Sequence, residues 1–89
     1  MDIQKCTFAG TMESSDAYVE IEPAKHGVEF SLESVVKEQF GDKIEAAVLD
    51  VLNKQGVKNA KIHVIDRGAL ECVIRARVET AVLRGKGEQ

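Results

Sequence analysis

The spacing of apolar side chains along these 89 residues changes from every second position to every third or fourth, and then back. Residues 17–22 alternate strictly between apolar and polar, and residues 28–32 resume the alternation after a break that carries Pro23 and Gly27. A period of two is typical of a half-buried strand, and turn residues between two such runs predict a β-hairpin. The side chains expected to face the core are Ala17, Val19, Ile21, Val28, Phe30 and Leu32.

A helical period occupies the middle of the chain, beginning at Ser34. Gly41 interrupts the apolar stripe, and Asp42 followed three residues later by Glu45 resembles a capping box. The helix is therefore expected to restart there after a short kinked turn, with residues 42–55 as its most regular part. The stripe that builds its apolar face consists of Val36, Phe40, Ile44, Ala47, Val48, Val51 and Leu52.

The second half of the chain begins with a stop signal for that helix. Gly56 follows the last apolar turn, where a glycine in the left-handed conformation would end the helix at Gln55 or Gly56. Alternation resumes at residues 60–65, and the run Asp66-Arg67-Gly68 predicts a turn after it. The core-facing side chains of this strand are expected to be Ala60, Ile62 and Val64.

Residues 70–79 fit both periods. The preceding turn signal and the alternating charges favour a strand, followed by a short helix near residues 79–84 and a frayed tail at residues 85–89. As a helix, the same segment would align Leu70, Val73, Ile74, Arg77 and Ala81. The pattern thus predicts a two-layer α+β fold in the order hairpin, helix, hairpin, with an antiparallel sheet of about four strands and the main helix on one face.

The length and composition of the chain limit its domain number and its class. A chain this short buries only about 60–65 % of its unfolded surface, so we expect a single domain over residues 1–89. Residues 1–16 are expected to be an N-terminal arm, whose first part, residues 1–9, is an arm or a short edge strand. Acidic residues outnumber basic ones by 15 to 12, and aromatic residues make up 4 %, which argues against nucleic-acid binding. An apolar leader and a membrane-spanning run are both missing, which predicts a cytoplasmic protein.

The cysteines and histidines do not form a catalytic or metal-binding pattern. Cys6 and Cys72 lie at opposite ends of the chain, and we expect reduced thiols that serve as small apolar residues. His26 and His63 share no motif, and each is expected to be a plain surface histidine. We therefore expect neither a metal site nor an independent enzyme.

Residues 10–16 carry the most distinctive polar group of the sequence. Two adjacent hydroxyls, Ser14 and Ser15, lie between the carboxylates of Glu13 and Asp16, with no histidine as a sequence neighbour. A reachable serine without a base suits modification by another enzyme better than catalysis of its own. The alternative is a plain loop whose polar groups turn the chain into the next strand, and the residues alone leave both readings open.

Arg75 and Arg77 would lie together on the outer face of the predicted strand 70–79. A pair of arginines in that position is either a solvated sheet face or a pair that docks a partner or holds a phosphate. The sequence pattern does not choose between these two readings.

Three separate blocks of the chain resemble one known family. They are Ala9-Gly10-Thr11-Met12-Glu13-Ser14-Ser15-Asp16, Gln39-Phe40-Gly41-Asp42, and Gly68-Ala69-Leu70-Glu71-Cys72-Val73-Ile74-Arg75-Ala76-Arg77. In this order and spacing they closely resemble the acyl carrier (gamma) subunit of citrate lyase. The family motif accepts Gly or Ser after the modified serine, so the resemblance assigns attachment to Ser14 and makes Ser15 the tolerated neighbour. Met12 stands where many members have Leu, a mild change.

The resemblance implies a carrier subunit, not a self-sufficient enzyme. Its cofactor would be 2'-(5''-phosphoribosyl)-3'-dephospho-coenzyme A, bound to Ser14 through a phosphodiester, whose thiol holds acetyl or citryl as a thioester. The implied partners are the alpha (acyl transferase) and beta (citryl lyase) subunits that cleave citrate to acetate and oxaloacetate, and the transferase that attaches the group. Glu13 and Asp16 are candidate recognition residues for that transferase.

Two other functions remain as alternatives. The related carrier of malonate decarboxylase uses the same type of arm, and a non-catalytic assembly module would carry no prosthetic group at all. Familiar acyl carriers are helical bundles with an Asp-Ser-Leu motif, which this chain lacks. A helical-bundle carrier is therefore not expected.

Overall fold

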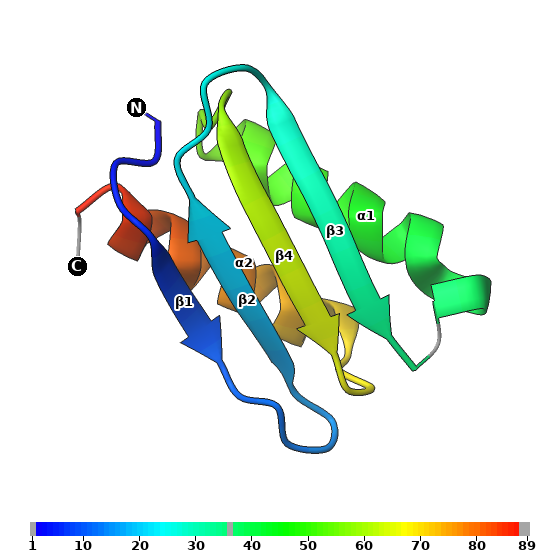
Figure 1. The fold of residues 1–89 in the computed structure, drawn as a ribbon. Helices are drawn as coiled ribbons and strands as arrows, with labels where there is room; N and C mark the ends of the chain where they lie inside the picture. The colour runs from blue at the N-terminus through cyan, green and yellow to red at the C-terminus, as the bar shows by residue number, and fades with distance from the viewer. Residues whose placement is uncertain (1, 36, 88–89) are drawn as a thin grey trace.

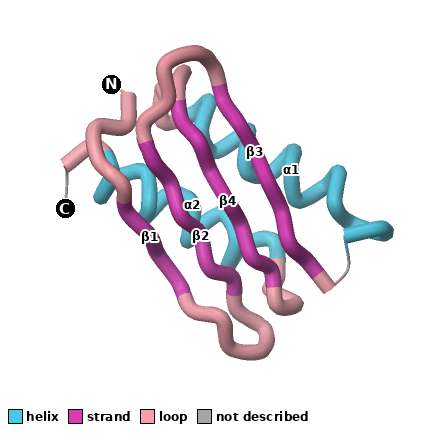
Figure 2. The backbone as a smooth tube through the Cα atoms, in the orientation of Figure 1, coloured by secondary structure: helices cyan, strands magenta, loops and turns pink. Residues whose placement is uncertain are grey.

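A computed structural model describes residues 2–35 and 37–87. Four strands form one layer, and two helices lie across one face of the sheet as the second layer (Figures 1 and 2). The elements in chain order are β1 (Thr7–Gly10), β2 (Ala17–Glu22), β3 (Val28–Ser34), α1 (Lys37–Lys54), β4 (Ala60–Asp66) and α2 (Glu71–Gly85). The predicted two-layer α+β class, with four strands and no helical bundle, is confirmed.

The strand order is β1-β2-β4-β3, and it corrects the prediction of two sequential hairpins. β4 lies between β2 and β3, pairing antiparallel with β2 and parallel with β3, so the sheet is mixed. Parallel strands need a crossover connection, and α1 provides it between β3 and β4. Alternation within each strand was visible in the sequence, but the partner of each strand depends on contacts between distant segments.

Residues 71–85 form α2, so the prediction of a strand over residues 70–79 is wrong. The helical stripe continues past that segment and buries Ile74, Val78, Ala81 and Val82 against the sheet. The sheet takes its fourth strand from β1 instead, which pairs with β2 at the edge. The helix expected near residues 79–84 is the second half of α2.

α1 is continuous through Gly41, so the predicted restart at Asp42 is not seen, and Ser34 ends β3 instead of opening the helix. Val36, which was assigned to the apolar stripe, lies outside the described residues. The predicted stop is confirmed, because Gly56 has a φ of +73°. The amide of buried Val57 donates to the Leu52 carbonyl at 2.9 Å, as expected for a helix that ends on a left-handed glycine.

The core lies between the sheet and the two helices. The inward residues predicted for β2 and β4 are all buried, while β3 is less covered, with Leu32 buried but Val28 exposed. Both helices add apolar side chains to the same cluster. The largest fully buried side chains of the cluster include Val19, Ile21, Val48, Leu52, Ile62, Val64, Ile74 and Val78.

The two ends of the chain pack against each other. Ile3 is buried in the core, and the amides of Gln4 and Lys5 donate to the carbonyl of Gly85 at 2.9 and 3.2 Å. Residues 85–87 are therefore held by these contacts and by the Lys86 side chain, which donates to the Gln55 carbonyl, so this part of the tail is not frayed. Residues 88–89 lie outside the described residues.

Candidate functional site

The loop that joins β1 to β2 presents the predicted attachment segment to solvent. Its side chains from Thr11 to Ser15 are exposed. The amide of Asp16 donates to the Glu13 carbonyl at 3.1 Å, which closes a β-turn with Ser14 and Ser15 as its central residues. Ser15 has a φ of +66°, a left-handed conformation that favours glycine. Ser14 therefore stands at the corner of a defined turn.

The Ser14 hydroxyl makes no hydrogen bond with any residue in the described part of the chain. A serine nucleophile would need a base within hydrogen-bond reach, and none contacts this oxygen among those residues. The geometry suits a hydroxyl that receives a group from another protein. Neither Ser14 nor Glu13 needs its side chain to hold the turn, because the turn uses their backbone.

Asp16 clamps the base of this turn to α2. Its two carboxylate oxygens accept bonds of 3.0 Å each from Nε and Nη2 of Arg77, the bidentate geometry of a strong charge-assisted pair. Thr11 Oγ1 donates to Oδ2 at 2.6 Å, and the Ala17 amide donates to Oδ1 at 2.7 Å. These bonds, the Thr11 bond first and then those from Arg77, hold the pKa of the Asp16 carboxyl well below its ordinary value.

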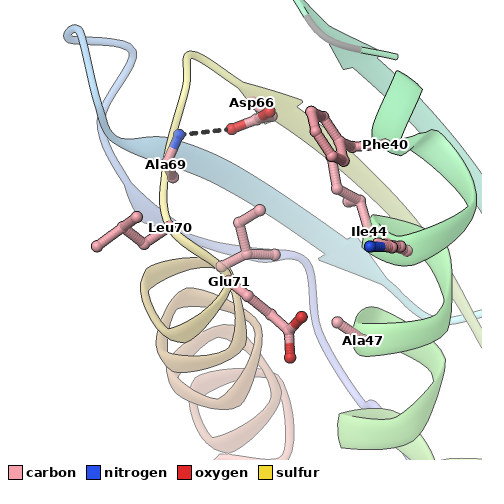
Figure 3. A pocket seen from close by; sticks show the side chains of 9 residues that line it. Phe40, Ile44, Ala47, Asp66, Ala69, Leu70 and Glu71 are labelled. Carbon is pink, nitrogen blue, oxygen red and sulfur yellow. Dashed lines mark hydrogen bonds between the residues drawn. The ribbon is translucent and has the colours of Figure 1, made fainter. Parts of the chain in front are cut away.

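The loop after β4 supports the turn from its other side. The Ser15 amide donates to the Arg67 carbonyl at 2.8 Å, and the Arg67 amide donates to the Asp16 carbonyl at 3.0 Å. Asp66, only 1 % exposed, shapes this second loop by accepting from the amide of Ala69 at 2.8 Å (Figure 3). The sequence run Asp66-Arg67-Gly68 indicated a turn, but nothing local in it indicated contact with residues 11–16.

Arg75 and Arg77 do not form the predicted pair on one strand face. They are two residues apart on α2, so they leave the helix in nearly opposite directions. Arg75 bonds Asp50 of α1 at 2.7 Å and Glu71 at 2.9 Å, and these bonds raise the pKa of its guanidinium. Of the candidate residues, the structure therefore gathers Glu13, Ser14, Asp16 and Arg77 and leaves Arg75 between the two helices.

Among the described residues, the other reactive side chains include one small polar group, in which His63 Nε2 lies 4.0 Å from Glu33 Oε1. Cys6 and Cys72 are free, as predicted, but both are exposed, so neither serves as a buried apolar residue. His63 Nδ1 lies 2.6 Å from Ser31 Oγ on the sheet face opposite the helices. Among residues 2–35 and 37–87, no group of three or more His, Cys, Asp or Glu is arranged to hold a metal, and neither helix there is long and apolar enough to cross a membrane.

Fold and site together define a small α+β module that presents two adjacent exposed serines, Ser14 and Ser15, on a clamped turn. The model of an acyl carrier family, described as malonate decarboxylase delta subunit (MdcD), matches residues 4–85. The citrate lyase acyl carrier protein of Oenococcus oeni is 44 % identical over 89 residues, covering 100 % of this chain and 92 % of that protein. Its counterpart in Escherichia fergusonii is 51 % identical over 85 residues, covering 94 % and 88 %. The chain belongs to the citrate lyase acyl carrier protein family.

Proposed function

We propose that this protein is the acyl carrier subunit of a citrate lyase and that Ser14 is its covalent attachment point. The observation that carries the proposal is the position of Ser14 at an exposed turn corner, with no partner for its hydroxyl among the described residues. A modifying enzyme can reach such an oxygen without breaking a hydrogen bond or unfolding a strand. The family membership supplies the acyl carrier role.

The residues around Ser14 fit the group expected from the family resemblance, 2'-(5''-phosphoribosyl)-3'-dephospho-coenzyme A joined through a phosphodiester. The side chains of Thr11 to Ser15 are exposed, so a bulky substituent on Ser14 Oγ meets no covering wall. The turn is held by backbone bonds and by Asp16, and substitution at Ser14 Oγ disturbs none of them. The bound group would supply a thiol on which acetyl or citryl is held as a thioester.

The other residues of the site have separate roles in this proposal. Asp16 and Arg77 fix the base of the turn, so Asp16 is a positioning residue and is not free for recognition. Glu13 is exposed and is the remaining acidic candidate for recognition by the transferase that attaches the group. The alpha and beta subunits of a cytoplasmic citrate lyase would then receive the loaded carrier in turn.

Intact mass of the protein from its native host tests the attachment. We expect the mass of the bare chain plus the prosthetic group, loss of that increment in Ser14→Ala, and its retention in Ser15→Ala. Citrate cleavage by the assembled complex should follow the same pattern. A bare-chain mass in a fully active complex would contradict the carrier role, and labelling that survives in Ser14→Ala but not in Ser15→Ala would move the site to Ser15.

A malonate decarboxylase carrier is the second candidate, because the matching family model is described as a subunit of that enzyme. The complex purified with this chain should be assayed with citrate and with malonate under the same conditions. Turnover of citrate supports the first candidate, whereas turnover of malonate alone supports the second.

A further inference from the structure

An apolar hollow of about 220 Å³ opens between α1 and α2, beside the end of β4 (Figure 3). Phe40 and Leu70 line it and remain 44 % and 71 % exposed, although both are large apolar side chains. Exposed apolar side chains gathered around a hollow are a typical feature of a ligand-binding site. Its other lining residues are Lys43, Ile44, Ala47, Asp66, Ala69, Glu71 and Ile74.

The loop between β4 and α2 connects this hollow to the turn that carries Ser14. Asp66, Ala69 and Leu70 form part of the lining. Arg67, which follows Asp66 in the same loop, exchanges backbone hydrogen bonds with Ser15 and Asp16. The bond from the Ala69 amide to Asp66 fixes the shape of this shared wall (Figure 3). The attachment turn and the hollow are therefore separated by a single short loop.

Two charged side chains that line the hollow differ in whether they have an ion-pair partner. Glu71 accepts a bond from Arg75 at 2.9 Å and so is already paired. The ammonium of Lys43 lies 5.9 Å from the centre of the Phe40 ring and makes no ion pair with any described residue. The lining thus combines an apolar surface with one cation that remains available to a carboxylate.

Resting on the proposed function, we propose that this hollow binds the thiol end of the arm on Ser14 together with its short acyl group. Pockets for drug-sized ligands occupy about 300–1,000 Å³. The hollow, at about 220 Å³, is below that range and suits a small acylated end, not the nucleotide part of the arm. An acyl group held there is shielded from water until a partner enzyme withdraws it.

A weak intrinsic affinity is sufficient for such a site. A short flexible tether produces an effective concentration in the millimolar range. A dissociation constant of about a millimolar for the free ligand therefore gives substantial occupancy once the ligand is tethered. The affinity to look for with a free ligand is therefore a dissociation constant of about a millimolar.

The test is a titration of free S-acetylpantetheine into the unmodified, isotopically labelled full chain, followed by NMR. We expect saturable shifts at Ile44, Ala47, Ala69 and Ile74, with a dissociation constant of about a millimolar. Because the ligand is free, this result does not depend on modification of Ser14, whose failure would be seen separately in the intact mass. Absence of saturable shifts, or shifts centred on another surface, overturns the proposal.

Matched variants locate the site. Ala69→Leu fills the hollow, whereas Ala46→Leu adds the same atoms at an exposed position of α1. We expect at least tenfold weaker binding in Ala69→Leu and no change in Ala46→Leu, and equal effects would overturn the assignment. If Ala69→Leu fails to fold, Phe40→Ala replaces it as the test, because this exposed side chain lines the hollow and is not part of the buried core. We expect weaker binding of S-acetylpantetheine in Phe40→Ala, and unchanged binding would overturn the assignment.

Discussion

Replacing Ser15 by glycine should stabilise the protein, because Ser15 holds a left-handed backbone conformation with a φ of +66°. A non-glycine residue there costs roughly 1–2 kcal/mol relative to an ordinary conformation. The greater freedom of glycine in the unfolded chain opposes the gain by roughly 0.4–1 kcal/mol. The net expectation is a stabilisation of about 1 kcal/mol for Ser15→Gly.

Thermal unfolding of the unmodified chain measures this effect. A change of 1 kcal/mol shifts the Tm of a domain this small by roughly 4–8 °C, well above the error of the measurement. Ser15→Ala keeps the strain and should leave the Tm nearly unchanged. Ser14→Gly is the matched control, because Ser14 has no positive φ, and it should lower stability by roughly 0.4–1 kcal/mol.

The outcome also bears on the attachment motif. If Ser15→Gly does not exceed Ser15→Ala in Tm, the backbone of Ser15 is not strained and its left-handed conformation costs no stability. If it does, the Gly or Ser that the family resemblance implies after the attachment serine has a conformational cause. Loading of the prosthetic group on Ser14 should then be retained in Ser15→Gly, as the intact mass would show.

Three further predictions concern the residues that hold the turn in place. Gly10→Ala should destabilise by more than about 2 kcal/mol in chemical denaturation, since its Cβ would lie 1.9 Å from the Ala17 carbonyl oxygen, whereas Gly27→Ala, also at positive φ but in open space, should cost only about 1 kcal/mol. Asp16 has a lowered pKa in the folded state, so its stabilising contribution is present above the unfolded value of 3.8 and is lost as pH falls from there toward the folded pKa; Asp16→Asn should make stability less dependent on pH in that window, and an unchanged acid limb would count against the clamp. Arg77→Ala should speed amide hydrogen exchange at Ser15, whereas Arg75→Ala, which cuts the link to Asp50, should leave that exchange rate unchanged.

The parts of the fold that were predictable depend on local patterns. β2 and β4 each bury alternate side chains, and the end of α1 at Gly56 follows from a left-handed glycine, so the sequence pattern identified all three. The strand prediction for residues 70–79 was wrong because the apolar positions of this short segment fit a period of two and a helical period equally well. The stripe becomes helical only when Ala81 and Val82 are included, since both are buried on the same face as Ile74 and Val78.

In the candidate site, too, the features set by local sequence could be predicted and those set by distant contacts could not. The exposure of Ser14 could be predicted from the small polar residues around it, and its assignment over Ser15 came from the family resemblance. The sequence pattern places Arg77 on a strand, and its bond to Asp16, 61 positions away in the sequence, depends on the helix that the structure has there. The support from the Arg67 backbone depends on the central position of β4, which the predicted hairpins had excluded.

The contact of Asp16 with Arg77 also limits how far Ser14 can move, and so determines which part of a loaded carrier provides the motion between partner enzymes. Asp16 is fixed by Arg77 and Thr11, and the Ser15 amide is bonded to the β4–α2 loop, so the two residues that follow Ser14 are both held by other parts of the fold. Ser14 therefore cannot travel far without breaking several hydrogen bonds at once. If Ser14 carries the arm, as proposed, movement between two partner active sites comes from the rotatable bonds of the arm and from reorientation of the whole module. A fixed root also stays joined, through the β4–α2 loop, to the wall of the hollow between α1 and α2, and a tether of this kind is what the proposed millimolar site requires.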